Sequence, residues 1–219
     1  MTARLVTEFI GAFVLVATIG FVVLQDAPFA PFAPLAIGTA LMIAVYMGGH
    51  ISGGHYNPAV TLGVWMRGKL DTRFVGPYMA VQVLGAAVAA VFVQMLMDTT
   101  FMPAPGPTAT MMDALLAELV FTFVLVLVVL NTATDEATAG NSYYGLAIGF
   151  TVLAAAYAVG GISGGAFNPA VGLGPAVVHA AGGNPIGHVW LYLVGPLLGG
   201  ALAALVYRVQ HPVLRAGTA

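Results

Sequence analysis

The sequence predicts an all-α integral membrane protein with six transmembrane helices and two re-entrant half-helices, arranged as an inverted two-fold repeat. Its 219 residues are 60% hydrophobic, and only six basic and eight acidic side chains occur. Several apolar runs approach the ~20 helical residues needed to cross a hydrocarbon core of about 30 Å. In addition, a Gly-Gly-x-x-Asn-Pro-Ala-Val motif occurs twice, at Gly53–Val60 and Gly164–Val171.

This composition excludes several classes of protein. A soluble domain cannot cover so much apolar surface, and a disordered chain has the opposite composition. The formal net charge is −2 and the basic residues are scattered, so nucleic acid is not an expected partner. Cysteine is absent, which removes disulfides, thiol catalysis and thiolate metal sites. With no visible nucleophile–base pair or metal cluster, we expect no enzyme, metal or cofactor, and we expect the lipid bilayer to surround one domain spanning residues 1–219.

Six apolar runs are the expected spans: Leu5–Leu24, Leu35–Met47, Phe74–Met97, Met111–Asn131, Tyr143–Val159 and Ile186–Tyr207. The first run could also belong to a signal peptide, but it takes part in the repeat, and we interpret it as a retained span. Proline-rich or polar stretches predict loops at Gln25–Pro34, Asp98–Thr110 and Thr132–Ser142. Two short segments, Asn57–Met66 and Asn168–His179, would form helices of only about 15 Å and cannot cross.

The distribution of basic residues predicts the topology. With six spans and two re-entrant segments, both termini and the loop around residues 67–73 lie on one side. All six basic residues then share that side: Arg4, Arg67, Lys69, Arg73, Arg208 and Arg215. Cytoplasmic loops concentrate such residues, so we expect cytoplasmic termini in a cell membrane, plasma or bacterial inner.

The two halves of the chain, about 1–97 and about 111–208, resemble each other. Glu8 precedes Asn57 by 49 residues, and Glu118 precedes Asn168 by 50. Because each half has an odd number of spans, the second half must be inverted relative to the first. Inverted repeats with broken helices place their functional site at the interface between the repeats.

The paired motifs are the strongest functional signal. Asparagine caps a helix and proline suits its first turn, so one such triplet would indicate only a helix start. Two triplets at matched positions, Asn57-Pro58-Ala59 and Asn168-Pro169-Ala170, predict two helix N-termini that meet in a pore. Their dipoles would repel cations, and the asparagine amides would donate hydrogen bonds to a passing solute.

The residues around these motifs have two expected roles. Backbone outside a helix is tolerated at membrane depth where it is buried in protein or lines a water-filled path. We therefore expect a ladder of carbonyl acceptors from Gly53, Gly54, His55, Gly164, Gly165 and Ala166. Glu8 and Glu118 lie well inside apolar runs, and we expect them to hold the N–H groups of the re-entrant loops. A proton-relay role is the alternative.

Both motif regions, Gly49–Gly63 and Gly161–Ala170, resemble the two signature loops of the aquaporin, or major intrinsic protein, family. The resemblance covers the whole chain, including the paired glutamates and Gly195-Pro196 of the last span. It implies six spans with two half-helices, a pore in each subunit and a homotetramer.

One position departs from the family pattern. The residue after the second motif is usually an arginine that forms the outer filter, and here it is Val171. By the same resemblance, the other filter positions fall at Ile37, Ala156 and Gly165. Such a filter has no charge, side-chain donor or aromatic ring, and resembles the arginine-lacking members found beside bacterial arsenic-resistance genes.

From these observations we expect a passive channel for water and small uncharged solutes, with a wide, apolar filter. Candidate solutes are polyols, urea, hydrogen peroxide and arsenous acid. Two alternatives remain open. One is an ion-coupled secondary transporter, since such proteins also contain inverted repeats and broken helices. The other is a non-conducting membrane junction or packing protein.

Overall fold

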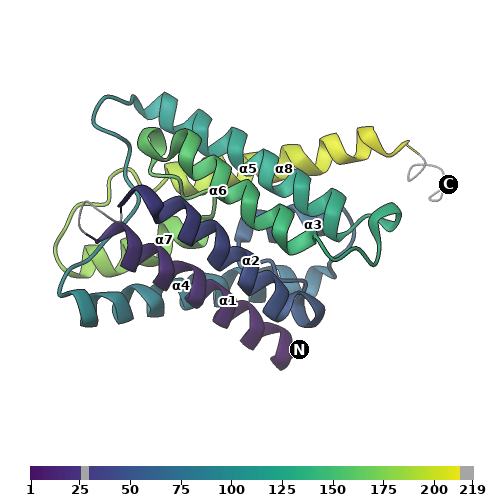
Figure 1. Cartoon of the computed structure of the whole chain (residues 1–219), viewed down its shortest axis with the longest axis horizontal. Helices are drawn as coiled ribbons and strands as arrows, with labels where there is room; N and C mark the ends of the chain where they lie inside the picture. The colour runs from purple at the N-terminus through teal and green to yellow at the C-terminus, as the bar shows by residue number, and fades with distance from the viewer. Residues whose placement is uncertain (26–29, 213–219) are drawn as a thin grey trace.

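The computed structural model describes residues 1–25 and 30–212, and within these ranges it contains helices and no strand (Figure 1). Six helices are long and apolar enough to span a membrane: α1 (Thr2–Val23), α2 (Ala33–Ser52), α4 (Thr72–Met97), α5 (Met111–Ala133), α6 (Tyr144–Ser163) and α8 (Leu191–Gln210). Two shorter helices are α3 (Pro58–Met66) and α7 (Pro169–Ala181), and two single 3₁₀ turns are η1 (Ala30–Phe32) and η2 (Glu136–Thr138). The predicted fold class is confirmed. Residues 26–29 of the expected first loop, and Arg215, lie outside the described residues.

Two spans extend further than the sequence predicted. Helix α2 continues through residues 48–52, and α6 continues through residues 160–163, although both segments contain paired glycines. Each helix ends where a glycine adopts a left-handed conformation, Gly53 with φ 98° and Gly164 with φ 87°. Glycine takes this conformation at no steric cost and commonly ends helices, so the second glycine pair, not the first, sets each boundary.

The last span begins later than the sequence predicted. Residues 186–190 form consecutive turns, with Val189 N donating to Ile186 O at 3.0 Å and Leu191 N donating to His188 O at 3.1 Å. These tighter turns follow Pro185 and occupy the segment before Leu191, where the regular helix starts.

The helix packing has a two-fold pattern. Helix α1 packs along α4, as α5 packs along α8, and α3 packs against α8, as α7 packs against α4. Two further contacts, α2 with α6 and α3 with α7, join equivalent elements of the two halves. Both short helices therefore lie inside a ring of six longer ones, and their N-terminal ends meet.

The start of α1, the end of α3 and the end of α8 lie at one end of the molecule (Figure 1). The described basic residues lie in or directly beside these segments and the start of α4. Arg4 and Arg73 each lie 5.1 Å from the centre of the Phe74 ring. Arg67 lies over the Tyr207 ring, and Arg208 donates to the carbonyl of Met66. We call this the basic end; the opposite end carries the loops 98–110 and 182–190.

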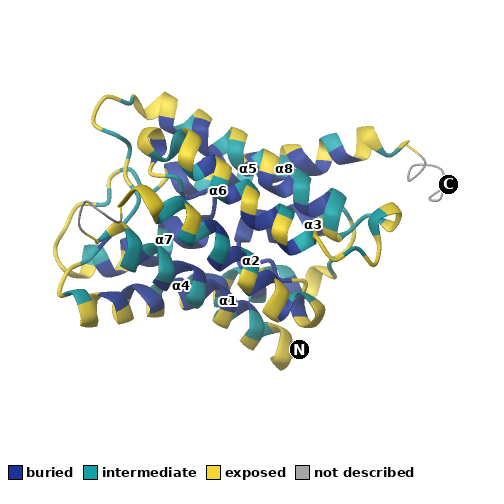
Figure 2. Ribbon diagram, viewed as in Figure 1, coloured by how far each residue is buried: buried dark blue, intermediate teal, exposed yellow. Residues whose placement is uncertain are grey.

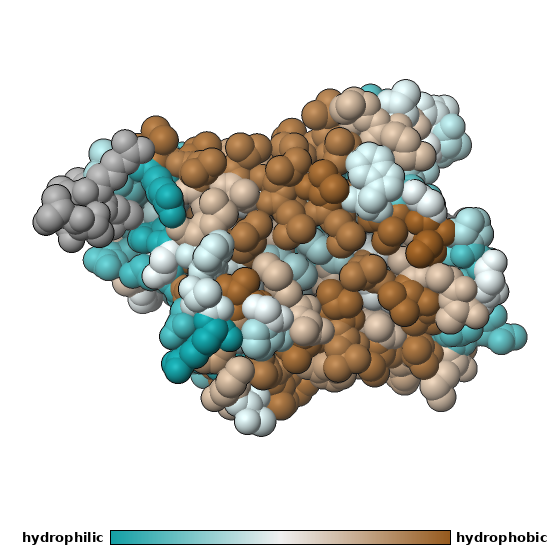
Figure 3. All heavy atoms as spheres, turned by 180° about the vertical axis from the view of Figure 1, so that it is seen from behind, coloured by the Kyte–Doolittle hydropathy of each residue, from teal (hydrophilic) through white to brown (hydrophobic). Residues whose placement is uncertain are grey.

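Polar and apolar residues are distributed as expected for a protein in a bilayer. Buried residues follow the faces where helices meet, and exposed residues follow the outer faces (Figure 2). Those outer faces are themselves apolar: Leu84 is 55% exposed and Phe150 is 51% exposed. On the face shown in Figure 3, hydrophobic side chains cover the middle, and hydrophilic residues gather towards the two ends. Lipid is the environment that suits such a surface.

Close helix crossings depend on matched glycines. A Cβ atom on Gly85 of α4 would lie 2.4 Å from the carbonyl oxygen of Phe9. In the second half, a Cβ on Gly199 of α8 would lie 2.4 Å from the carbonyl oxygen of Leu119. Small residues let transmembrane helices approach closely in this way.

Gly85→Ala should therefore destabilise the folded protein by about 2 kcal/mol, because the added methyl group overlaps backbone that cannot move aside. The matched control is Gly76→Ala on the same helix, where an added Cβ meets nothing within 4 Å. Thermal unfolding in detergent measures both variants. Equal melting temperatures for the two would show that the α1–α4 crossing tolerates the methyl group.

Candidate pore and its two half-helices

The N-termini of α3 and α7 are capped in the same way. The Asn57 side-chain oxygen accepts a hydrogen bond from Ala59 N at 2.8 Å, and the Asn168 oxygen accepts one from Ala170 N at 2.9 Å. Pro58 and Pro169 occupy the first helical position, where a missing N–H costs nothing. With nine and 13 residues, both helices stop short of a full crossing.

The two asparagines also bind each other's loops. Asn57 Nδ2 donates to the carbonyl of Phe167 at 2.9 Å, and Asn168 Nδ2 donates to the carbonyl of Tyr56 at 2.9 Å. The sequence predicted only donation towards a solute. Because an amide nitrogen carries two protons, each asparagine can hold the opposite loop and still offer one donor.

The loop before each half-helix has an unusual backbone. In the first half, Gly53, Gly54 and Tyr56 have φ values of 98°, 64° and 50°. In the second half, Gly164, Gly165 and Phe167 have values of 87°, 65° and 48°. Tyrosine and phenylalanine rarely adopt positive φ, so the surrounding contacts must hold these two residues in place.

The buried aromatic rings of Tyr56 and Phe167 make contacts that hold their backbone in place. Tyr56 is fully buried, and its hydroxyl donates to the carbonyl of Ala44 at 2.9 Å. A Cβ on Gly11 would lie 2.1 Å from the Tyr56 ring, so only glycine leaves room for it. Phe167 is 1% exposed and packs against Phe121, with 6.0 Å between ring centres.

Glu8 holds the first loop through its carboxylate. Oxygen Oε1 accepts bonds from Ser52 Oγ at 2.6 Å and His55 N at 3.0 Å. Oxygen Oε2 accepts bonds from Tyr56 N at 2.7 Å and Gln82 Nε2 at 2.8 Å. Glu8 is fully buried, so all four donors belong to the protein.

Glu118 holds the second loop with three of the four equivalent bonds. Ser163 Oγ donates at 2.8 Å, Ala166 N at 3.0 Å and Phe167 N at 2.7 Å. No counterpart of the Gln82 bond is present among the described residues. The sequence predicted that both glutamates hold the loops but did not predict the serines, although both precede the Gly-Gly pairs at matched positions.

A narrow cavity of about 20 Å³ passes the point where the half-helices meet. It is lined by Leu15, Ile19, Ile37, Leu41, Gly54, His55, Asn57, Val60, Leu125, Val129, Ile148, Val152, Gly165, Ala166, Phe167, Asn168 and Val171. Among these, only His55, Asn57 and Asn168 have side-chain hydrogen-bonding groups. A water molecule needs roughly 10–15 Å³ of such space, so the cavity has room for about one water molecule.

The structure brings together three of the four expected filter residues. Ile37, Gly165 and Val171 line the narrow cavity, whereas Ala156 is half-buried on α6 and is not among its lining residues. Val60, the residue after the first motif, lines the same cavity. Valine therefore occupies the matched position in both halves, and no charge enters the lining there.

The expected carbonyl-ladder residues divide among three places. Gly54, His55, Gly165 and Ala166 line the narrow cavity. Gly53 lines a wider space of about 690 Å³ at the basic end, which we call the vestibule. Gly164 instead packs against the loop 98–110, since a Cβ there would lie 2.7 Å from Ala104 N.

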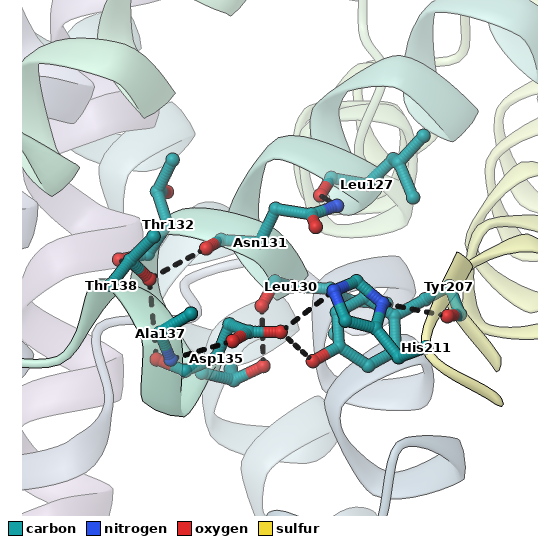
Figure 4. A network of polar contacts seen from close by, with 10 residues as sticks. Leu127, Leu130, Asn131, Thr132, Asp135, Ala137, Thr138, Tyr207 and His211 are labelled. Carbon is teal, nitrogen blue, oxygen red and sulfur yellow. Dashed lines mark hydrogen bonds and ion pairs between the residues drawn. The ribbon is translucent and has the colours of Figure 1, made fainter. Parts of the chain in front are cut away.

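The vestibule is bordered by charged residues that also bind one another. Lys69 lies 3.4 Å from Glu136 of η2, and Asp135 lies at the start of the same turn. Figure 4 shows Asp135 between α5 and α8, with His211 and Tyr207 turned towards its carboxylate. His211 Nε2 is 3.0 Å from Asp135 Oδ2, and the Tyr207 hydroxyl donates to the same oxygen. This network could not be predicted from the sequence, because Asp135, Tyr207 and His211 come from segments far apart in the chain.

Comparison with known proteins fits this geometry. A family model described as "Major intrinsic protein" matches residues 1–207. The chain belongs to this family. The members of this family are channels rather than enzymes, and this chain is a multi-pass membrane protein of the family.

Three relatives show the breadth of the family. Aquaporin AqpM from Methanothermobacter thermautotrophicus is 39% identical over 183 residues, covering 80% of this chain and 74% of that protein. Glycerol uptake facilitator protein-like 6 from Lactiplantibacillus plantarum is 34% identical over 221 residues, covering 94% and 97%. Aquaporin NIP1-1 from Oryza sativa subsp. japonica is 37% identical over 181 residues, covering 82% of this chain but only 62% of the rice protein.

A solved structure supports the fold independently. The X-ray structure of the aquaglyceroporin from Plasmodium falciparum superposes with a TM-score of 0.85 at 26% identity, covering 98% of each chain. The likeness therefore extends over nearly the whole length of the major intrinsic protein fold.

Glu8→Ala should lower the free energy of unfolding by about 3 kcal/mol, because it leaves buried loop donors without an acceptor. Glu136→Gln is the control, since the Glu136 side chain is 88% exposed and should change stability by less than about 0.5 kcal/mol. Melting in detergent, read out by circular dichroism, compares the two. If Glu8→Ala had the same melting temperature as the control, the stability of the loop would not depend on the Glu8 carboxylate.

The network in Figure 4 predicts that the folded protein loses stability in acid. The Tyr207 hydroxyl and the Ala137 N–H donate to Asp135 and hold the pKa of its carboxyl below the usual range, with His211 and Arg67 adding positive charge nearby. A pKa lowered by folding gives stability that is present above the unfolded value of about 3.9 and is lost as pH falls through the folded value.

Asp135→Asn should therefore reduce stability at neutral pH and flatten the loss of stability between about pH 5 and pH 2. Melting temperatures of the variant and the native protein, measured across that range, test this. Parallel curves for the two proteins would mean that Asp135 does not contribute to the acid sensitivity.

Proposed function

We propose that this chain is a passive channel for water and small uncharged solutes, with an apolar filter that lacks a fixed charge. The observation that carries the proposal is the narrow cavity at the meeting point of two capped half-helices, lined almost entirely by aliphatic side chains. An apolar lining offers an ion no replacement for its hydration shell, and the two helix N-termini add a positive potential that repels cations.

The cavity dimensions refine the expected solutes. A space of about 20 Å³ accepts water directly, whereas a polyol, urea or arsenous acid requires the lining side chains to move apart. Ile37 and Val171 are the filter side chains that would have to move apart. Gly165 has no side chain to obstruct the path. The wide filter predicted from the sequence is therefore proposed as a property of the conducting state.

The coupled-transporter alternative lacks support in the described site. Both intramembrane carboxylates, Glu8 and Glu118, are fully buried, bind loop donors and are absent from the cavity lining. A coupling site would need a carboxylate in contact with the path.

The assembly and orientation are part of the same proposal. Apolar outer faces on α2, α4 and α6 suit lipid or further copies of the chain, and the family resemblance supports a homotetramer. The clustering of basic residues supports cytoplasmic termini in a cell membrane. We further propose one channel domain over residues 1–219 that contains the two repeats.

The proposal is tested by stopped-flow light scattering on liposomes that contain the purified protein, with water, glycerol, urea and arsenite as solutes. Water permeability should rise above that of empty liposomes and stay unchanged when a proton or sodium gradient is imposed. Permeability equal to empty liposomes would favour the non-conducting alternative, and a dependence on either gradient would favour the transporter.

Val171→Arg should shift selectivity towards water. The variant adds a fixed charge and a multi-donor fork beside Gly165, which narrows the path and raises the barrier to larger solutes. The glycerol-to-water and arsenite-to-water permeability ratios, measured on one liposome preparation, should fall by about tenfold. Val177→Arg on α7 is the control, because Val177 is 53% exposed on the outer surface. Unchanged permeability ratios in Val171→Arg would show that Val171 does not line the constriction.

A further inference from the structure

The two halves of the pore differ at one polar cluster. His55 and Thr61 in the first half correspond, at the 111-residue spacing of the motifs, to Ala166 and Gly172 in the second. The first-half cluster lies beside the lining and is continuous with the Glu8 carboxylate, whereas the second half has no polar side chain at either position.

The third member of the cluster is Gln82 of α4, and its counterpart on α8 is Pro196. The correspondence follows from two tyrosines 114 residues apart that make the same bond. Tyr78 donates to the carbonyl of Ser52 at 2.8 Å, and Tyr192 donates to the carbonyl of Ser163 at 2.6 Å. The same spacing relates residue 82 to residue 196.

The Glu8 carboxylate determines how the Gln82 amide is oriented. Gln82 Nε2 lies 2.8 Å from Glu8 Oε2 and 2.9 Å from Thr61 Oγ1, so both amide protons are used. The opposite orientation would place the amide oxygen against a carboxylate oxygen, with two acceptors facing each other. The present orientation leaves Gln82 Oε1 without a partner among the described residues, a cost that the bond to Glu8 outweighs.

Thr61 is therefore an acceptor towards Gln82 and must place its own proton elsewhere. Thr18 and Thr39, like many helical threonines, donate to the carbonyl four residues earlier, at 2.9 and 2.6 Å. Thr61 has no such bond within the described chain. Its remaining neighbour is His55 Nδ1, at 3.1 Å.

A hydroxyl proton directed at His55 Nδ1 requires that nitrogen to be the unprotonated one. A protonated Nδ1 would leave the fully buried Thr61 hydroxyl surrounded by donors, with no acceptor for its proton. The neutral ring must then carry its proton on Nε2. Tyr78 packs edge-on against the imidazole, with 5.4 Å between ring centres, and keeps the ring from turning.

The Nε2 atom lies on the side of the path. It has no hydrogen-bond partner among the described residues, and a Cβ on Gly53 would lie 3.0 Å from it. Gly53 lines the vestibule, and His55 lines both the vestibule and the narrow cavity. The ring thus stands where the two spaces join.

We propose that Thr61 and Gln82 are positioning residues that hold His55 in its Nε2-protonated tautomer, so that the basic end of the narrow pore presents one fixed hydrogen-bond donor to a solute oxygen. This deepens the proposed function and rests on it. The solutes recognised are those with an oxygen acceptor: water, a polyol hydroxyl or the carbonyl of urea. The donor replaces part of the hydration lost on entry, which the aliphatic lining cannot do.

The tautomer is measured directly by solid-state nitrogen NMR on protein labelled with ¹⁵N in its histidines and reconstituted in liposomes. The chain has five histidines, and His55→Ala identifies the His55 signals by their loss. At neutral pH, His55 should show an unprotonated Nδ1 and a protonated Nε2. A protonated Nδ1 of His55 in the native protein overturns the proposal, and this result needs only the His55→Ala protein that assigns the signals.

Thr61→Val, which removes the hydroxyl at nearly constant volume, should let the Nδ1-protonated tautomer appear, while Thr61→Ser should keep the native signals. Thr122→Val is the matched control, because Thr122 is also fully buried and its hydroxyl has no partner among the described residues. An unchanged His55 tautomer in folded Thr61→Val would overturn the role of Thr61.

Permeability completes the test. Water and glycerol flux should fall about fivefold in Thr61→Val, roughly the factor that one hydrogen bond contributes, and should stay at the native level in Thr61→Ser and Thr122→Val. A shifted tautomer with unchanged flux would show that the donor does not serve the solute. Native liposomes without flux would instead contradict the proposed channel, while the nitrogen signals would still report the tautomer.

Discussion

The structure depends on finding hydrogen-bond partners for backbone that is not helical in the middle of a membrane protein. Water is scarce at that depth, and an unpaired N–H costs several kcal/mol. Here the two loops before α3 and α7 supply their N–H groups to two buried carboxylates, Glu8 and Glu118, on the first helix of each half. Without these acceptors, the paired glycines and the two residues of positive φ at Tyr56 and Phe167 could not remain in one conformation.

This constraint explains the polarity of the path. The glutamate carboxylates bind the loop N–H groups on the side of each loop that faces away from the cavity. These N–H groups therefore do not line the cavity. What remains at the centre is two helix N-termini, each capped by an asparagine that also binds the opposite loop. Because α3 and α7 are tied to each other in this way, the narrow cavity keeps its small volume although it is lined by flexible aliphatic side chains.

Much of this arrangement could be predicted from the sequence because it is encoded locally and twice. The Asn-Pro-Ala triplets predicted the helix starts, and the paired glycines predicted the non-helical loops. The helix ends were misjudged for a local reason: only backbone conformation distinguishes Gly53, which ends α2, from Gly48 and Gly49, which continue it.

Contacts between distant segments could not be predicted in this way. Gln82 is one polar residue in an apolar span, and nothing in its sequence context points to Glu8 or Thr61. Asp135 and His211 are separated by most of the second half of the chain. Ala156 shares a face of α6 with Ile148 and Val152, which line the narrow cavity, and the sequence does not determine how far the cavity extends along that face.

The proposed solute path runs between the two asparagine caps, Asn57 and Asn168. The most direct test is the water permeability of liposomes that contain Asn168→Leu, compared with the native protein at equal, verified amounts of folded channel. Water permeability should fall about tenfold or more, because a branched apolar side chain replaces the donor in the narrow cavity and breaks the hydrogen bond to the Tyr56 carbonyl. Native permeability in a folded Asn168→Leu protein would contradict this prediction, since the path would then have to lie elsewhere.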